Sequence, residues 1–184
     1  MVYKINIAGL ERDLKLCPLN DQLSIAAFVM FGDVELTEHC AAELLKRAPA
    51  FDVMITAESK GIPLVYEMSR LAGQNRYVLA RKSVKVYMTD VVSYNVTSIT
   101  TKNRQTLYLD GEDAAYLKDK RVLIVDDVVS TGESLIALEN LVSKAGGKIA
   151  GRLTVLAEGD AQYREDLIYL ERLPLFHADG SILE

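Results

Sequence analysis

Two adjacent acidic residues, Asp126 and Asp127, stand between a short apolar run and a turn rich in hydroxyl groups, in the segment VLIVDDVVSTGES of residues 122–134. The apolar run is typical of a strand that is covered on both faces of a sheet. In the turn, small side chains around Gly132 let the backbone approach a ligand closely. Backbone N–H groups, hydroxyl groups and the positive end of a following helix would bind a phosphate group there.

Two carboxylates next to a phosphate-binding turn would repel the phosphate, so the acids must serve another group beside it. A sugar diol, a bound metal or a protonating base would fit that description. The sequence contains neither the G-x-x-x-x-G-K-[ST] loop of nucleoside triphosphate enzymes nor the G-x-G-x-x-G turn of dinucleotide enzymes. The segment therefore indicates a phosphorylated sugar as the ligand.

Strands and helices alternate along the chain, which is the pattern of an α/β protein with an open, mostly parallel sheet flanked by helices. We expect strands at 52–56, 77–80, 121–126 and 148–157 and helices at 36–48, 62–71 and 133–145. Residues 83–110 are rich in Val, Thr, Ser and Tyr with near-alternating polarity, which predicts a long β-hairpin with a polar tip at 100–105. Ligands gather beyond the carboxyl ends of parallel strands, so the site is expected at that edge of the sheet.

Composition and charge limit the possible classes of protein. With 184 residues, 49% of them hydrophobic and 26% charged, the chain is expected to form a single domain over residues 1–184. A formal charge of -5 gives no basic field that would draw the protein to nucleic acid, and no apolar run approaches the roughly 18 residues that a membrane helix needs. Cys17 and Cys40 are too few for a disulfide framework. We expect a cytoplasmic protein with no nucleic acid or membrane partner.

The order of apolar strand, paired acids, short spacer and T-G-x-S turn resembles the phosphoribosyl pyrophosphate (PRPP) motif of the type I phosphoribosyltransferases. The resemblance implies a transferase in which Asp126 and Asp127 hold the ribose hydroxyls and the turn holds the 5-phosphate. It makes Mg²⁺ the expected cofactor, held by the two acids either directly or through water. The PRPP-binding residues implied in this segment are Asp126, Asp127, Val129, Ser130, Thr131, Gly132, Glu133 and Ser134.

Two upstream segments match the same family in the expected order. Residues 57–61, Ala-Glu-Ser-Lys-Gly, are similar to its pyrophosphate loop, and Arg81-Lys82 with Lys85 resembles the R-K-x-x-K sequence of the adenine and orotate branches. Expulsion of pyrophosphate requires positive charge on the leaving group, which these basic side chains can supply. A lysine that only covers a helix start and a solvated strand end are the alternatives. The resemblance implies that PRPP is bound by Glu58, Ser59, Lys60, Gly61, Arg81, Lys82 and Lys85, of which Lys60 and Arg81 join the two acids in catalysis.

The hairpin predicted at 83–110 would be a movable lid that closes over PRPP. Its Ser93-Tyr94 pair resembles the S-Y pair of the adenine branch, which makes Tyr94 a candidate catalytic residue; packing across the hairpin is the alternative. The glutamate that the family places shortly after this tyrosine is Thr97 here, so the proton-handling residue of the lid is not identified.

The branches of the family differ at positions that bear on the base. The hypoxanthine-guanine branch carries an aspartate directly before T-G, where this chain has Ser130, and the orotate branch has Glu-Asp at the acid pair and a basic-His-Gly lid that is absent here. The adenine and xanthine branch shares the acid pair, R-K-x-x-K and S-Y. We therefore favour adenine, with xanthine or orotate as alternatives. In that branch a hood covers the base, and a small N-terminal/C-terminal hood is expected here, with residues 1–34 as its main segment.

Three residues are candidates for contact with the base. Phe28 and Phe31 of the hood could stack on a purine ring, although packing in a helix core explains them equally well. Glu158, after the fourth strand, could face the base or lie in a plain surface turn. The resemblance also implies a homodimer and a role in purine salvage. A non-catalytic PRPP sensor is the second class of function, but such a regulator usually carries a basic DNA-binding domain, and none fits before Leu36.

Overall fold

In the computed structural model of the protein, which describes residues 1–96 and 105–183, a five-stranded parallel sheet forms the centre. Its strands, in order across the sheet, are β10 (Ile168–Leu173), β9 (Lys148–Glu158), β8 (Arg121–Val129), β4 (Val53–Ala57) and β5 (Val78–Ala80). Each adjacent pair is parallel. The predicted α/β fold with an open parallel sheet is confirmed.

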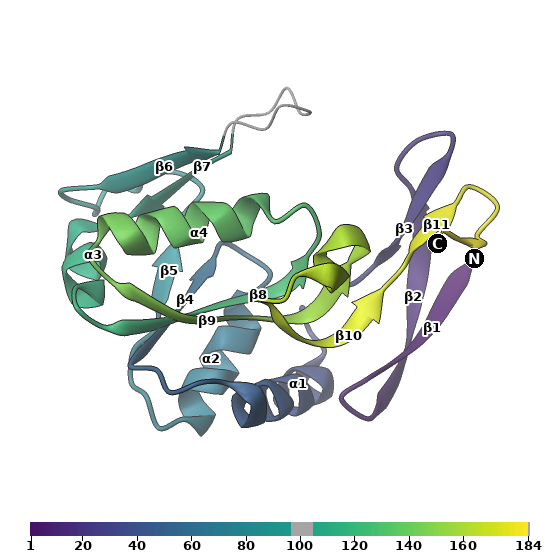
Figure 1. Ribbon diagram of the computed structural model, residues 1–184, viewed down its shortest axis with the longest axis horizontal. Coiled ribbons are helices and arrows are strands. Elements are labelled where there is room, and N and C mark those ends of the chain that lie inside the picture. Colours follow the sequence, from purple (N-terminus) through teal and green to yellow (C-terminus); the bar gives the residue numbers. More distant parts are fainter. Residues whose placement is uncertain (97–104, 184) are drawn as a thin grey trace.

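Helices cover both faces of this sheet (Figure 1). They are α1 (Val34–Arg47) and α2 (Ile62–Leu71) on one face, and α3 (Gly111–Leu117) and α4 (Glu133–Lys144) on the other. Successive strand residues point to opposite faces, so β8 divides its apolar side chains between two cores. Leu123 and Val125 join the α1–α2 core, and Val122 and Ile124 join the α3–α4 core. Because both faces are covered, the strand is apolar until it reaches the acids.

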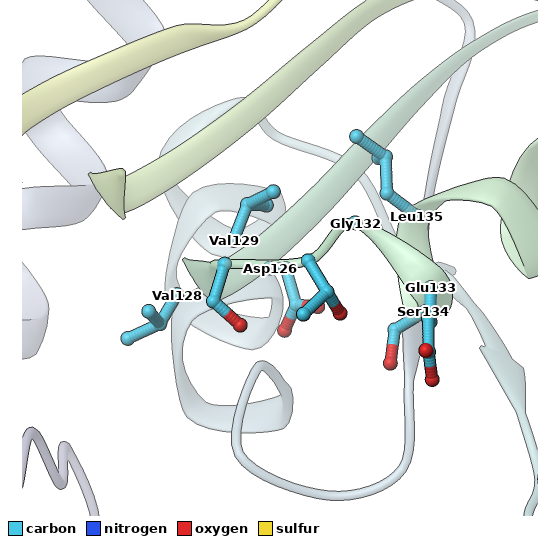
Figure 2. A pocket seen from close by; sticks show the side chains of 9 residues that line it. Asp126, Val128, Val129, Gly132, Glu133, Ser134 and Leu135 are labelled. Atoms are coloured by element: carbon cyan, nitrogen blue, oxygen red, sulfur yellow. The ribbon is translucent and has the colours of Figure 1, made fainter. Parts of the chain in front are cut away.

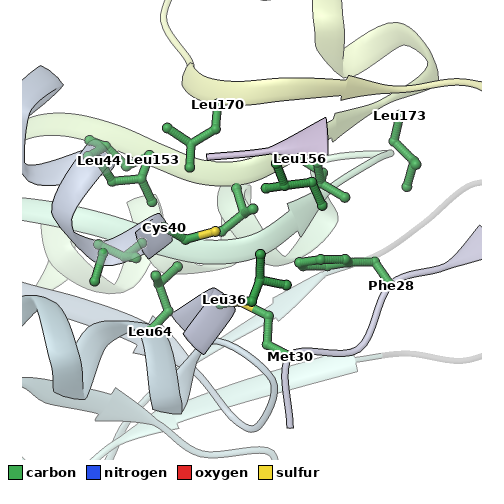
Figure 3. Close-up of a cluster of buried hydrophobic side chains, with 14 of the residues drawn as sticks. Phe28, Met30, Leu36, Cys40, Leu44, Leu64, Leu153, Leu156, Leu170 and Leu173 are labelled. Atoms are coloured by element: carbon green, nitrogen blue, oxygen red, sulfur yellow. The ribbon is translucent and has the colours of Figure 1, made fainter. Parts of the chain in front are cut away.

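The first helix shows why the sequence pattern predicted it. Leu36, Cys40 and Leu44 recur every four residues and are all buried in the core between α1, α2 and the sheet (Figure 3). The helix begins two residues earlier than the predicted range of 36–48, because the Asp33 carboxylate accepts the backbone N–H of Leu36 and caps the helix.

A second, antiparallel sheet stands at one end of the parallel sheet and contains both chain termini (Figure 1). Its strands, in order, are β1 (Val2–Ile7), β2 (Leu10–Pro18), β3 (Leu23–Ala27), β11 (Leu175–His177) and β12 (Ile182–Leu183). We call this sheet the hood. Arg12 of β2 donates to Asp33 at 2.7 Å and to Glu35 at 2.8 Å, and its hydrogen bond keeps the pKa of Asp33 below the usual range. These two contacts of the Arg12 guanidinium fix the hood against the start of α1.

The hairpin is shorter than predicted. Only β6 (Val92–Val96) and β7 (Gln105–Leu109) pair, whereas residues 83–91 form an irregular loop held by a turn at Lys85–Met88 and by the Asp110 carboxylate, which accepts the N–H of Thr89. The prediction of 83–110 as one hairpin is therefore wrong in its first third. Leu107 and Leu109 of β7 are fully buried in the α3–α4 core, so this core holds the described end of the hairpin in place. The predicted tip at 100–105 lies largely outside the described residues.

Several elements were not predicted: the five hood strands, β10, α3 and a short 3-10 helix, η1 (Gly159–Tyr163). Strand β8 also continues past the acids, because Val128 and Val129 pair with Leu156 and Ala157 of β9. Among the helices of the described residues, none has the length and apolar character to cross a bilayer.

Candidate active site

Asp126 and Asp127 lie near the carboxyl end of β8, the central strand of the parallel sheet. Their carboxyl groups lie close enough to interact with each other, and Asp126 also lies beside Gly61 of the predicted pyrophosphate loop. Asp126 faces the start of α4 and also accepts the backbone N–H of Asp127 at 2.9 Å. Asp127 faces the start of α2, where it meets Lys60. The two acids thus connect the phosphate turn on one side with the predicted pyrophosphate loop on the other.

The predicted phosphate turn encloses a small pocket at the start of α4 (Figure 2). Its volume is about 140 Å³, and residues 128–135 and Asp126 line it. Gly132 has a φ of 77°, a left-handed conformation that glycine adopts without strain and that turns the chain into α4. No side chain caps this helix, so its first N–H groups are free for an anion. The pocket suits one phosphate group, since whole small molecules need roughly 300–1,000 Å³.

Asp127 is buried, yet its oxygen Oδ2 has no hydrogen-bond partner within the described residues. Lys60 Nζ lies 3.4 Å from this oxygen, and half of the Lys60 side chain is exposed. Burial, and then the charge of Asp127, raise the pKa of Asp126 well above its usual value. The pair is therefore destabilised as it stands and would gain from a donor or a cation.

This donor set suits Mg²⁺ better than a metal that needs a protein cage. The described residues hold no group of three or more His, Cys, Asp and Glu side chains in reach of one ion. Mg²⁺ usually binds through one or two carboxylates and takes its other ligands from water and substrate phosphates. The orphaned oxygen of Asp127 beside Asp126 fits that mode.

The predicted pyrophosphate loop joins β4 to α2, and its charged side chains point to different partners. Lys60 reaches Asp127, whereas Glu58 turns the other way: it accepts the N–H of Lys82 at 3.0 Å and lies 3.5 Å from Arg81 Nη2. The Lys82 hydrogen bond is the main cause that lowers the pKa of Glu58. Glu58 is therefore placed to hold the basic strand end. Its predicted contact with PRPP stays a prediction, in which the carboxylate would have to meet a hydroxyl group or a metal, since it has no hydrogen to donate to a phosphate.

Arg81 joins the basic group to the hairpin. Its backbone exchanges two hydrogen bonds with Tyr108 of β7, at 2.8 and 2.9 Å, and its side-chain Nε is buried without a partner in the described part of the chain. Lys82 and Lys85 follow in the exposed loop, where Lys85 Nζ donates to Ser83 Oγ at 2.7 Å. The structure thus brings Lys60 and Arg81 to the sheet edge and places Lys82 and Lys85 in the exposed loop that follows.

Two predicted residues do not face the site. Phe28 is 4% exposed and lies among Met30, Leu36 and Leu156 in the core (Figure 3), so this structure favours the core-packing alternative, and stacking on a base stays a prediction. Tyr94 packs on the α3–α4 core, with Lys144 Nζ 5.4 Å from its ring centre. Lys144 is the last residue of α4, about 16 Å along the helix from the phosphate turn at 1.5 Å per residue.

A second cleft lies between the hood and the phosphate turn. It has a volume of about 760 Å³, which is large enough for a heterocyclic base with part of a sugar. On the hood side it is apolar, and the sheet edge contributes polar groups. The lining includes Leu19, Leu23, Ile25, Leu175, Thr131 and Glu158. Of the residues predicted to contact the base, Glu158 lines this cleft, and Phe31 is half exposed in the loop before α1.

Sequence reasoning missed the hood leucines, because only the paired hood strands show which of their side chains face the sheet. It also missed Arg164, whose guanidinium donates to Asp166 at 2.9 and 3.0 Å while its Nη1 lies against Gly132. This arginine supports the phosphate turn from the cleft side. No local pattern marked it, since residues 164 and 132 are far apart in the chain.

A parallel α/β sheet with a phosphate turn, an acid pair and basic groups at one edge defines a phosphosugar-binding protein of the α/β class. A family model described as a phosphoribosyl transferase domain matches residues 35–179, and the chain belongs to this family of transferases. The prediction of an enzyme of this family is confirmed.

Individual relatives agree on the family and differ in the base. The chain is 32% identical over 162 residues to a hypoxanthine/guanine phosphoribosyltransferase of Methanotorris igneus, covering 83% of this chain and 84% of that relative. It is 30% identical over 161 residues to one of Methanococcus maripaludis, covering 83% of each. Among solved structures, an adenine phosphoribosyltransferase of Thermoanaerobacter pseudethanolicus aligns with a TM-score of 0.72 at 20% identity, over 86% of this chain and 95% of that one. The corresponding Saccharomyces cerevisiae enzyme aligns with a TM-score of 0.68 at 18% identity, over 86% and 92%. At these identities the structures show a shared fold.

Proposed function

We propose that the protein is a purine phosphoribosyltransferase that transfers the 5-phosphoribosyl group of PRPP to a base, with adenine favoured, and releases pyrophosphate in purine salvage. The observation that carries the proposal is the acid pair of β8, which lies between a phosphate-sized pocket and a lysine-bearing loop. PRPP carries a phosphate, a diol and a diphosphate in the same order.

Each part of PRPP has a place in this arrangement. The 5-phosphate lies in the pocket of the turn, where the N–H groups of α4 and the hydroxyls of Thr131 and Ser134 donate to it. The ribose diol lies over Asp126 and Asp127, which accept its hydrogen bonds. Mg²⁺, when bound by the two acids and by PRPP oxygens, supplies further positive charge on the leaving group.

The transfer breaks the bond between the ribose anomeric carbon and the diphosphate oxygen, and the bonding electrons leave with the pyrophosphate. A ring nitrogen of the base then forms the new bond to that carbon, and the base loses its N–H proton to the departing pyrophosphate or to water. Lys60 and Arg81 stabilise the leaving pyrophosphate, together with the loop backbone at Ser59 and Gly61. Lys82 and Lys85 of the exposed loop add their positive charge to the same group. The hood keeps water from the sugar cation while it is exposed.

Hypoxanthine and guanine form the second candidate pair of bases, because the relatives that are 30–32% identical carry that name. Adenine is favoured because Ser130 occupies the position before T-G, where an aspartate would exchange a proton with the N7 of a 6-oxopurine. Either kind of purine would bind in the same cleft of about 760 Å³ under the hood.

We also propose a cytoplasmic homodimer. Val84, Val86 and Tyr87 form an exposed apolar strip on the loop that carries the lysines, and a second copy would remove this strip from water. Two free cysteines support a reducing compartment. Light scattering coupled to size exclusion, on the protein and on a Val86→Asp variant, tests the dimer: a monomeric wild type would refute it.

The activity is tested with purified protein, PRPP and Mg²⁺, offering adenine, hypoxanthine, guanine, xanthine and orotate in turn and measuring pyrophosphate release and nucleotide product. Turnover with a purine supports the proposal. PRPP binding by calorimetry without turnover would favour a sensor instead. If neither binding nor turnover is found in the presence of Mg²⁺, the proposed function is refuted.

A further inference from the structure

Glu158 is the last residue of β9, and its carboxylate is half buried without a hydrogen bond or ion pair to another described residue. Outside the acid pair of β8, three other shielded acids, Asp33, Glu67 and Glu139, each meet an arginine. Burial raises the pKa of Glu158, and the charge of Lys60 opposes that shift. An acid kept desolvated and unpaired costs stability, so its position is explained by a ligand that donates to it.

The surroundings of Glu158 define what that ligand looks like. The cleft under the hood has Leu23 and Ile25 on one wall and Glu158 on the other, and Thr131 of the phosphate turn lies in the same cleft. A ribose held by the turn and the acid pair would therefore direct its base into this cleft. A flat ring would be covered by the leucine and isoleucine on the hood side and would present a polar edge to Glu158.

We infer that Glu158 determines which purine is accepted, by taking a hydrogen bond from the exocyclic amino group of adenine. The inference rests on the proposed function and adds to it the residue that selects the base. Carboxylate oxygens only accept hydrogen bonds, so the 6-amino group of adenine is a partner and the 6-oxo group of hypoxanthine is a second acceptor facing a negative charge. A hydrogen bond to a charged group of this kind corresponds to about 10- to 100-fold in kcat/KM.

The test compares adenine with hypoxanthine, two purines that differ at C6, on the wild type and on Glu158→Gln. Glutamine keeps the size of the side chain and can donate to the oxo group, so the adenine-to-hypoxanthine ratio of kcat/KM should fall at least 10-fold, while the KM for PRPP stays unchanged. The matched control is Glu165→Gln, which removes an exposed acid outside the lining of the cleft and should leave the ratio as it is. The melting temperature of Glu158→Gln should equal or exceed that of the wild type, because the variant removes a desolvated charge, and the control variant should match the wild type.

A second measurement needs no variant. Unsubstituted purine lacks the amino group, and the wild type should use it at least 10-fold less well than adenine. An unchanged ratio in Glu158→Gln, equal use of purine and adenine, or a wild type that prefers hypoxanthine would each overturn the role of Glu158 while leaving the transferase in place. A wild type that turns over no base would overturn the proposed function and this inference with it.

Discussion

Replacement of Gly61 by alanine is the sharpest test of how the pyrophosphate loop is positioned. Gly61 precedes α2 with a φ of -72°, which any residue can adopt, so the glycine is not required by its conformation. Glycine is required there for steric reasons, because a Cβ at this position would overlap with Oγ1 of Thr56, a fully buried residue of β4. Because Thr56 is short, branched and packed in the sheet, it cannot move aside.

The magnitude follows from this overlap. The added Cβ would lie more than 1 Å inside ordinary contact distance, so the loop has to rise from the sheet by at least about 1 Å. Overpacking of this kind costs about 1–3 kcal/mol of stability. The same displacement separates Lys60 and the loop N–H groups from the acid pair, and a shift of about 1 Å in a positioned group costs on the order of 100-fold in rate.

Two measurements distinguish a displaced pyrophosphate loop from a damaged phosphate turn. Gly61→Ala should lower kcat for pyrophosphate release about 100-fold, whereas ribose 5-phosphate, which lacks the pyrophosphate, should bind as tightly as to the wild type by calorimetry. Thr56→Ala removes Oγ1, so the double variant should recover most of the lost kcat. Thr56→Val places a methyl group where the hydroxyl was and should give no recovery. Wild-type kcat in Gly61→Ala, or equal recovery by both Thr56 variants, would refute the steric argument.

Three further outcomes follow from the contacts. Asp127→Asn should raise the KM for PRPP at least 10-fold without lowering the stability, because it removes a buried negative charge beside Asp126; a large loss in thermal unfolding would show a structural role instead. Arg121 donates to Asp52, and this hydrogen bond lowers the pKa of Asp52 to about 2. That stability is present above the unfolded pKa and is lost as the pH falls, so melting curves of Asp52→Asn and wild type should differ at pH 7 and converge between about pH 4 and pH 2. Leu107→Ala should lower the free energy of unfolding by about 2–5 kcal/mol in urea, and a smaller loss would mean that the hairpin base is not part of the core.

The parallel sheet and the phosphate turn could be predicted from local sequence. Apolar runs such as the one before Asp126 are typical of strands that are covered on both faces. Gly132 with its hydroxyl-bearing neighbours is typical of a turn that binds an anion. Helix periodicity located α1 and α2 to within about two residues. These signals are local, because the residues that create them are neighbours in the chain.

The roles of single side chains could not be predicted in the same way. Phe28 and Phe31 are equivalent in the sequence, yet one is buried in the core and the other is half exposed. Glu58 belongs to a loop whose sequence resembles a pyrophosphate site, and only the fold shows that it holds the backbone of Lys82. Each outcome depends on which distant segment lies opposite the residue.

By itself, then, the sequence determined four strands of the parallel sheet, the helices α1, α2 and α4, the position of the phosphate turn and the family, because short-range patterns encode burial and turns. Tertiary structure decided the rest: the hood made from both chain ends, the cleft beneath it, the shorter hairpin and the unpaired carboxylate of Glu158. The physical reason is that a cleft and a buried charge are properties of several segments at once, and their distances exist only after the chain has folded.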